Sequence, residues 1–80
     1  MSSIRLQQVF QKALGIPADM IRDDLQYNSI KEWDSVGHMT LVAEIESSFE
    51  IMLDTDEILG MSSFAKAREI LQNHGIQCDA

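Results

Sequence analysis

Ser35 is the residue whose type and position could do chemistry, because it directly follows an acidic residue, Asp34, at the predicted start of a helix. Free backbone N–H groups and a partial positive charge gather at a helix N-terminus, and both suit a phosphate ester on a serine hydroxyl. A serine in a first helical turn is, however, far more often a capping residue than a modified one. These two residues alone therefore leave two hypotheses for Ser35: a helix cap and a phosphate attachment site.

Other reactive residues give weaker signals. Ser35 lies in no Gly-x-Ser-x-Gly pattern and has no obvious acid–base partners, which argues against a hydrolase. Asp54 and Asp56 begin like a calcium-binding loop, but Ile58 occupies the next ligand position and no glycine follows at the sixth. Cys78 is the only cysteine, so it can form no internal disulfide, and we interpret it as an inert thiol near the chain end.

The chain has 80 residues, and we predict a single domain over residues 1–80. Its net charge of −7 is concentrated in residues 23–61, which hold one basic and ten acidic side chains. This charge excludes nucleic acid as a partner and favours basic protein surfaces, with a solvated acidic face kept for solubility as the alternative. No apolar run approaches the length of a membrane span and no signal peptide is visible, so we expect a cytoplasmic protein with no membrane partner.

Helical spacing of apolar residues predicts an all-α bundle with three main helices and one short helix. Residues 15–34 lack this spacing and are expected to form a long loop pinned over the core by Ile16, Ile21, Leu25, Ile30 and Trp33. The expected first helix runs from a cap at Ser2 or Ser3 to about Leu14, with Gly15 as its stop, and the second is capped by Asp34 and runs from Ser35 to about Phe49. A one-turn helix is expected from residues 54–57 to Leu59, and a last helix from a cap at Ser62 or Ser63 to a stop at Gly75.

The second helix has two faces when successive residues are placed about 100° apart. The predicted core face consists of Leu41, Val42, Ile45 and Phe49. The opposite face consists of Val36, Thr40, Ala43 and Ser47, close to the acidic residues Asp34, Glu44 and Glu46. A small apolar patch with an acidic rim suits a transient docking surface.

Residues 34–51, DSVGHMTLVAEIESSFEI, resemble the signature of the acyl carrier proteins: Asp-Ser followed by an aliphatic residue, an aliphatic stripe, an acidic residue and Phe-x-Ile. The resemblance continues without a gap and covers roughly residues 4–75. Its further matching positions are Ile58, Met61, Ser62, Ser63, Phe64, Ala67 and Ile70. It implies a small four-helix bundle of acyl-carrier type, and the wording around Trp33 is similar to stand-alone carriers of specialised pathways.

The resemblance also implies a function. A phosphopantetheinyl transferase would move 4′-phosphopantetheine from coenzyme A to Ser35, and Asp34 would assist this transfer. The arm would hold an acyl or aminoacyl cargo as a thioester for an activating ligase and for acyl-transferring or condensing enzymes. The chain itself would be a monomer and no enzyme. Its docking residues would be Val36, Thr40, Ala43 and Glu44; the alternative is an unmodified acidic helical interaction module.

Gly37 and His38 depart from this family's pattern, because many fatty-acid carriers have acidic residues directly after the modified serine. Gly37 weakens a helix by up to about 1 kcal/mol relative to alanine, so it either permits a close approach of a partner or of the arm, or is simply tolerated. His38 falls on the core side of the helix. We expect it to be a structural histidine that bonds the long loop.

Overall fold

The computed structural model describes residues 4–76, and its first helix, α1, spans Ile4–Leu14. The buried residues of α1 are Leu6, Val9, Phe10 and Leu14. Because they recur at helical intervals, they form one stripe against the core. Gly15 ends the helix with a φ of 68°, and its N–H donates to the Gln11 carbonyl over 2.8 Å. This left-handed conformation favours glycine, as the sequence predicts for the end of the helix.

The segment after α1 is a long loop that contains one short 3-10 turn, η1, at Ala18–Met20. Its buried side chains are Ile16, Ile21, Leu25 and Trp33, and Ile30 is partly buried. The Tyr27 N–H donates to the Ser62 carbonyl over 2.8 Å, and the Phe64 N–H donates to the Leu25 carbonyl over 2.9 Å. These contacts confirm that the loop is pinned over the core, and they tie it to the segment before the last helix.

The central helix, α2, spans Ser35–Phe49. Asp34 is its N-cap, because one carboxylate oxygen accepts a hydrogen bond of 2.8 Å from the Gly37 N–H. The buried residues of α2 are Leu41, Val42, Ile45 and Phe49, which is the core face predicted from the sequence. The helix ends at Glu50, which adopts the left-handed conformation with a φ of 56°.

Two further helices follow, α3 at Thr55–Gly60 and α4 at Phe64–Asn73. In α3, Asp54 and Glu57 each accept a hydrogen bond from the other's backbone N–H, which forms a capping box. Ser63 caps α4. The buried residues of α4 are Phe64, Ala67, Ile70 and Leu71. No residue of α3 is fully buried, although Ile58 is partly buried and packs against the core, so polar contacts add to a small apolar contact in holding this short helix.

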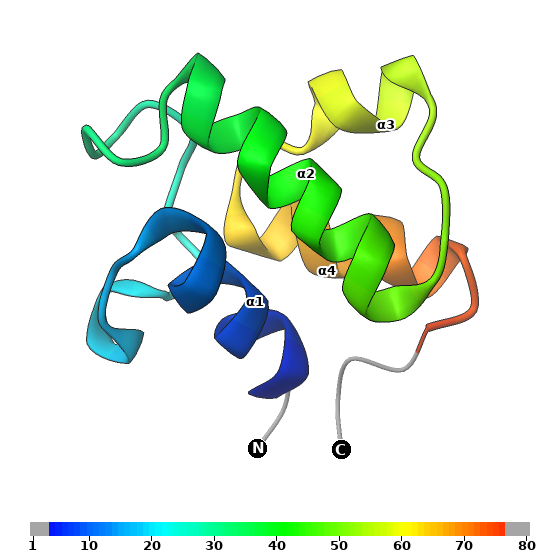
Figure 1. Ribbon diagram of the computed structural model, residues 1–80, viewed down its shortest axis with the longest axis horizontal. Helices are drawn as coiled ribbons and strands as arrows, with labels where there is room; N and C mark the ends of the chain where they lie inside the picture. Colours follow the sequence, from blue (N-terminus) through cyan, green and yellow to red (C-terminus); the bar gives the residue numbers. More distant parts are fainter. Residues whose placement is uncertain (1–3, 77–80) are drawn as a thin grey trace.

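The helices surround one core. Figure 1 shows α2 crossing in front of α4, with α1 along one side and α3 along the other. At the centre, the Phe10 ring of α1 meets Trp33 of the loop and Phe64 of α4 edge to face, with ring centroids 5.3 and 4.9 Å apart. Aromatic pairs prefer this arrangement. The core therefore joins the long loop to both of these helices.

These elements confirm an all-α fold over the described part of the chain, with three main helices, one short helix and a long first loop. No strand occurs between residues 4 and 76; an isolated antiparallel bridge links Gln26 and Ser63. The cap expected at Ser2 or Ser3 and the thiol of Cys78 lie outside the described residues.

Gly37 lies where the backbone of the long loop passes very close to α2. A Cβ atom at this position would lie far inside van der Waals contact with the Glu32 carbonyl oxygen, and 3.4 Å from a carboxylate oxygen of Asp34. The close approach at Gly37 is therefore made by the chain's own backbone, which was not predicted from the sequence. Because a carbonyl cannot turn aside as a flexible side chain can, the loop would have to move to admit a methyl group.

Gly37→Ala is expected to lower the free energy of unfolding by about 1–3 kcal/mol, because overpacking outweighs the gain of up to about 1 kcal/mol in helix propensity. The measurement is urea denaturation followed by circular dichroism. Gly60→Ala is the matched control, because nothing lies within 4 Å of its added Cβ. A Gly37→Ala protein as stable as the Gly60→Ala protein would contradict the close approach.

Both histidines of the chain bond to α3. The His38 side chain of α2 reaches the Ile58 carbonyl over 2.8 Å, and the His74 side chain after α4 reaches the Glu57 carboxylate over 2.8 Å. These bonds fall on consecutive residues of a helix without buried residues. The position of α3 against the bundle therefore depends on two imidazole rings as well as on the packing of Ile58.

Glu57→Gln is expected to make the loss of folding stability at low pH less steep. The hydrogen bond from His74, with a second one from the Asp54 N–H, holds the pKa of Glu57 below its ordinary value of 4.5. The stability from Glu57 is therefore complete above about pH 4.5 and is lost as the pH falls through the lower folded pKa. Glutamine preserves the capping box.

The measurement is the urea concentration at which half of the protein is unfolded, determined at several pH values between about pH 6 and pH 3. Glu69→Gln, which removes a charge from an exposed pair with Lys66, is the control. An acid decline as steep in Glu57→Gln as in the wild type would contradict the prediction.

Candidate functional site

Ser35 is the first residue of α2, and its side chain is exposed. Asp34, the residue before it, is exposed as well and supplies the N-cap through its bond to Gly37. The capping role thus falls to Asp34 and not to Ser35. The two residues that the sequence singles out lie side by side at the N-terminus of the longest helix in the described part of the chain.

Tyr27 is the partner of Ser35 that sequence reasoning misses. Its phenol oxygen lies 3.2 Å from the Ser35 hydroxyl oxygen, and either atom can donate the hydrogen. Tyr27 comes from the long loop, eight residues earlier in the chain. No helical or strand period connects the two positions, so no sequence pattern points to this contact. The loop therefore supplies a side chain that contacts Ser35 as well as packing over the core.

His38 joins three elements through both of its ring nitrogens. The Trp33 Nε1–H donates to His38 Nδ1 over 2.9 Å, and His38 Nε2 bonds to the Ile58 carbonyl over 2.8 Å. Because an indole N–H only donates and a carbonyl only accepts, Nδ1 is unprotonated and Nε2 carries the hydrogen. This confirms the prediction of a structural histidine that bonds the long loop. With both nitrogens engaged, His38 is not directed at Ser35 as a base.

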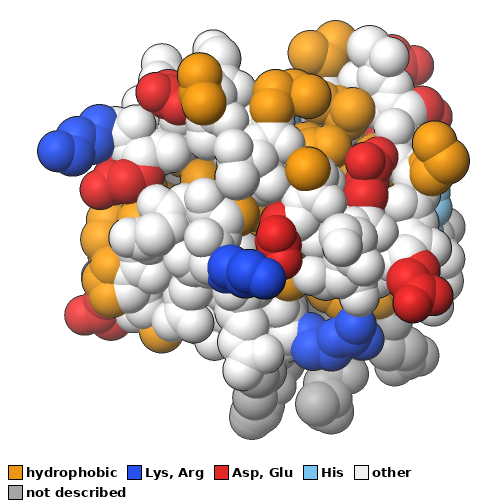
Figure 2. Space-filling view, viewed as in Figure 1, with side chains coloured by type: hydrophobic (Ala, Val, Ile, Leu, Met, Phe, Trp, Pro, Cys, Tyr) orange, Lys and Arg blue, Asp and Glu red, His pale blue; other side chains and the backbone are white. Residues whose placement is uncertain are grey.

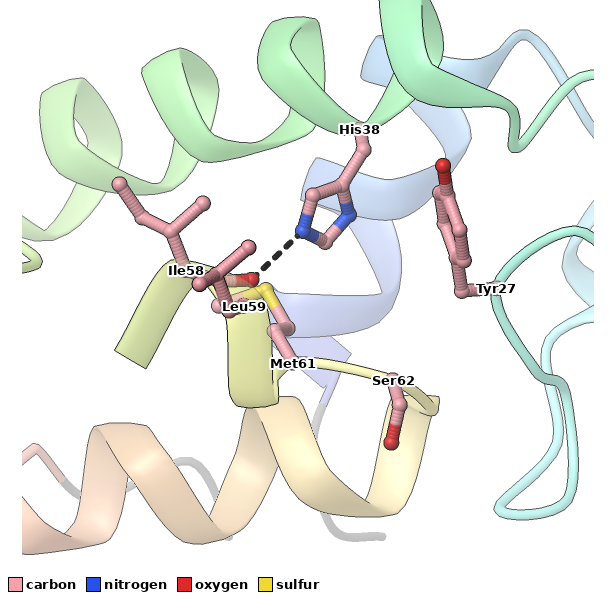
Figure 3. Close-up of a pocket in the computed structure, with 6 residues that line it drawn as sticks. All are labelled: Tyr27, His38, Ile58, Leu59, Met61 and Ser62. Atoms are coloured by element: carbon pink, nitrogen blue, oxygen red, sulfur yellow. Dashed lines mark hydrogen bonds between the residues drawn. The ribbon is translucent and has the colours of Figure 1, made fainter. Parts of the chain in front are cut away.

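A hollow of about 140 Å³ lies beside this site. Its lining residues are Tyr27, His38, Ile58, Leu59, Met61 and Ser62. Figure 3 shows the Tyr27 ring on one side, the side chains of α3 on the other, and His38 reaching down from α2 between them. The phenol hydroxyl of Tyr27 points toward α2. Through this one ring, the hollow adjoins the Ser35 hydroxyl.

Three of the four candidate docking residues form an outward strip on α2. Val36, Thr40 and Ala43 are exposed, and Val36 retains 75 % of its accessible surface. Glu44 differs: its carboxylate pairs with Lys12 of α1 over 3.2 Å, and its side chain is only 25 % exposed. The strip of Val36, Thr40 and Ala43 is therefore accessible to a partner. The acidic charge that Glu44 was expected to add to it is instead paired with Lys12 of the same chain.

Apolar side chains gather on the surface where the first half of α2 meets α3, as Figure 2 shows. The large exposed apolar residues of these two helices are Val36, Met39 and Leu59. We call these three residues the apolar patch. Because it adjoins the first turns of α2, it lies on the same end of the molecule as Ser35.

Metal chemistry finds no support in the described residues. Between residues 4 and 76, no group of three or more His, Cys, Asp or Glu side chains is arranged to hold a metal ion. Asp54 and Glu57 instead bond to each other's backbone in the capping box of α3. The acidic stretch therefore starts a helix.

His38→Phe is expected to destabilise the fold by about 1–3 kcal/mol, because it leaves the buried Trp33 N–H without an acceptor. Trp33 is 0 % exposed, so water cannot replace the lost bond. The measurement is a double-mutant cycle with Trp33→Phe in urea. If the bond is the cause, the double variant loses less than the sum of the single losses. Additive losses would contradict it.

Comparisons of the chain with protein-family models, with curated proteins and with solved structures found no match. None of the described helices is long and apolar enough to cross a membrane. The site is therefore described by its geometry alone. An exposed serine at the start of a helix contacts a tyrosine from the long loop, and this tyrosine lines a small hollow.

Proposed function

We propose that the chain is a carrier protein of the acyl-carrier type, with 4′-phosphopantetheine attached to Ser35. The observation that carries the proposal is the exposed Ser35 hydroxyl at the first residue of α2, directly after Asp34 and in register with the carrier-like pattern of buried residues downstream. An all-α bundle with a long first loop is what the resemblance of the sequence implies, and the fold supports the proposal to that extent.

The surroundings of Ser35 suit a bulky phosphodiester. The side chain is exposed, so the hydroxyl can be reached from solvent. The N-terminus of a 15-residue helix favours negative charge at this position. The hydroxyl oxygen would form a bond to the pantetheine-bearing phosphorus of coenzyme A, as the bond from that phosphorus to the bridging oxygen breaks. Adenosine 3′,5′-bisphosphate would leave, and the hydroxyl proton would pass to the transferase or to water.

The thiol at the end of the arm would supply thioester chemistry, which the described side chains lack. The protein's own residues would serve attachment and presentation. Asp34 would keep the first turn of α2 formed through its bond to Gly37 and would assist the transfer with its carboxylate. These two tasks are compatible, because only one of its oxygens takes part in the cap.

The partners would dock on the face of α2 that carries Val36, Thr40 and Ala43. These partners are the phosphopantetheinyl transferase, an acyl- or aminoacyl-activating ligase, and acyl-transferring or condensing enzymes. Because Lys12 already pairs with Glu44, this carboxylate is less available to a basic partner. The apolar patch would then contribute more to docking than charge does.

An unmodified interaction module is the second candidate function. The apolar patch favours it, because exposed apolar side chains near one another suit a protein partner whether or not Ser35 is modified. The two candidate functions share the fold and differ only in whether the Ser35 hydroxyl group is modified.

Incubation with coenzyme A and a promiscuous phosphopantetheinyl transferase is expected to add a single phosphopantetheine to the protein. Intact-mass spectrometry measures the addition. Ser35→Ala should abolish it, while Ser47→Ala, an exposed serine further along the same helix, should leave it unchanged. A folded wild-type protein that stays unmodified would contradict the carrier and leave the interaction module.

The same assay separates the two tasks of Asp34. Asp34→Ser keeps a good N-cap and removes the carboxylate, whereas Asp34→Ala removes both. A slower transfer to Asp34→Ser, with α2 intact by circular dichroism, would support direct assistance. Transfer that is slowed only in Asp34→Ala would assign Asp34 to capping alone.

A further inference from the structure

Tyr27 is fixed in place more firmly than its exposure suggests. The side chain is 38 % exposed, yet its ring lies edge-on to Trp33 and His38, with centroids 6.3 and 5.2 Å apart. Its backbone N–H donates to the Ser62 carbonyl over 2.8 Å. Trp33 is itself completely buried and bonded to His38. The packing of the Tyr27 ring and the hydrogen bond of its backbone therefore hold the phenol hydroxyl next to the Ser35 oxygen.

Modification of Ser35 would change the character of this hydrogen bond. In the unmodified protein either oxygen can donate, because both carry a hydrogen. Once Ser35 is esterified its oxygen has none, so only Tyr27 can donate. Its acceptor would then be a charged non-bridging oxygen of the phosphate in place of the esterified Ser35 oxygen, and such a hydrogen bond is about twice as strong as one between neutral groups. The contact would therefore strengthen at the moment the arm is attached.

The same ring also lines the hollow beside α3. Figure 3 shows it facing His38 and the residues of α3 across this space. A phosphate held at the phenol hydroxyl would place the first atoms of an arm at the edge of the ring, next to the hollow. Leu59, which lines this space and is 75 % exposed, is the side chain that the arm would meet there.

We propose that Tyr27 is the positioning residue for the arm on Ser35: its hydroxyl donates to the phosphate, and its ring directs the arm toward the hollow between the loop and α3. This role rests on the proposed function. It assigns the long loop a part in presenting the cargo, because the loop determines where the arm leaves the protein surface.

The test compares holo wild type with holo Tyr27→Phe, which keeps the ring and loses only the hydroxyl. The first readout is the ³¹P chemical shift of the arm, with each holo protein in urea as its unfolded reference. In the wild type, the folded signal should differ from the unfolded one. In Tyr27→Phe it should move more than half of the way back. Holo Ser47→Ala, altered at an exposed serine of the same helix, should match the wild type.

Nuclear Overhauser contacts provide the second readout. Contacts between the paired methyl groups of the pantetheine arm and the Leu59 methyl groups are expected in the wild type and should weaken in Tyr27→Phe. A purely structural role for the hydroxyl would not move these signals once circular dichroism shows the same helix content in both proteins.

A third readout needs no variant. The chain has one tyrosine, so protein labelled with ¹³C at the tyrosine ring carbon that bears the hydroxyl gives a single signal. This signal should shift when the apo protein is converted to the holo form. A ¹³C signal that does not shift would overturn the role of Tyr27 while leaving the carrier proposal in place. The same conclusion would follow from ³¹P shifts that are identical in Tyr27→Phe and wild type. A wild type that accepts no phosphopantetheine would overturn both proposals.

Discussion

The need to satisfy one buried indole N–H organises the end of the molecule that carries Ser35. Trp33 is fully buried, and an unpaired donor there would cost about 1–3 kcal/mol. His38 Nδ1 accepts this hydrogen bond, which places the hydrogen of the neutral ring on Nε2, and Nε2–H bonds to the Ile58 carbonyl. One imidazole thus sets the positions of the loop, α2 and α3 relative to one another. The absence of a side chain at Gly37 lets the loop come close enough for this arrangement.

The polar attachment of α3 follows from the same geometry. α3 has six residues and none of them is buried, so the hydrophobic effect alone holds it weakly. His38 bonds to it from α2 and His74 from the end of α4. Because Ile58 and Leu59 of α3 line the hollow near Ser35, these two hydrogen bonds also help to hold that wall of the hollow in place.

Periodicity in the sequence was enough to predict the helices and most of the core. The stripe of Leu41, Val42, Ile45 and Phe49 and the stops at Gly15 and Gly75 follow from spacing and backbone preference, and the structure agrees. Ser35 and Asp34 were also predicted to lie together at the start of α2. A periodic pattern assigns each residue to a face of its own helix. The core stripe and the helix ends can be predicted from that information alone.

Contacts between elements lay beyond such patterns. The bond between Tyr27 and Ser35 joins an aperiodic loop to a helix. The pair between Lys12 and Glu44 joins two helices whose separate patterns do not specify which charges face each other. Gly37 could be recognised as unusual in a helix, but only the path of the loop shows what approaches it. These are questions of how elements pack, and composition and spacing do not determine the answer.

The charge distribution of α2 bears on how a partner could bind. A helix that offered Glu44 to basic partners would attract them over a distance, with a strong dependence on salt. Here Lys12 already pairs with that carboxylate, and the apolar patch of Val36, Met39 and Leu59 is exposed. Three side chains fall short of the roughly 800 Å² per partner that a stable interface buries. Binding at this patch would therefore be brief, which is what the proposed carrier needs if it is to leave one enzyme for the next.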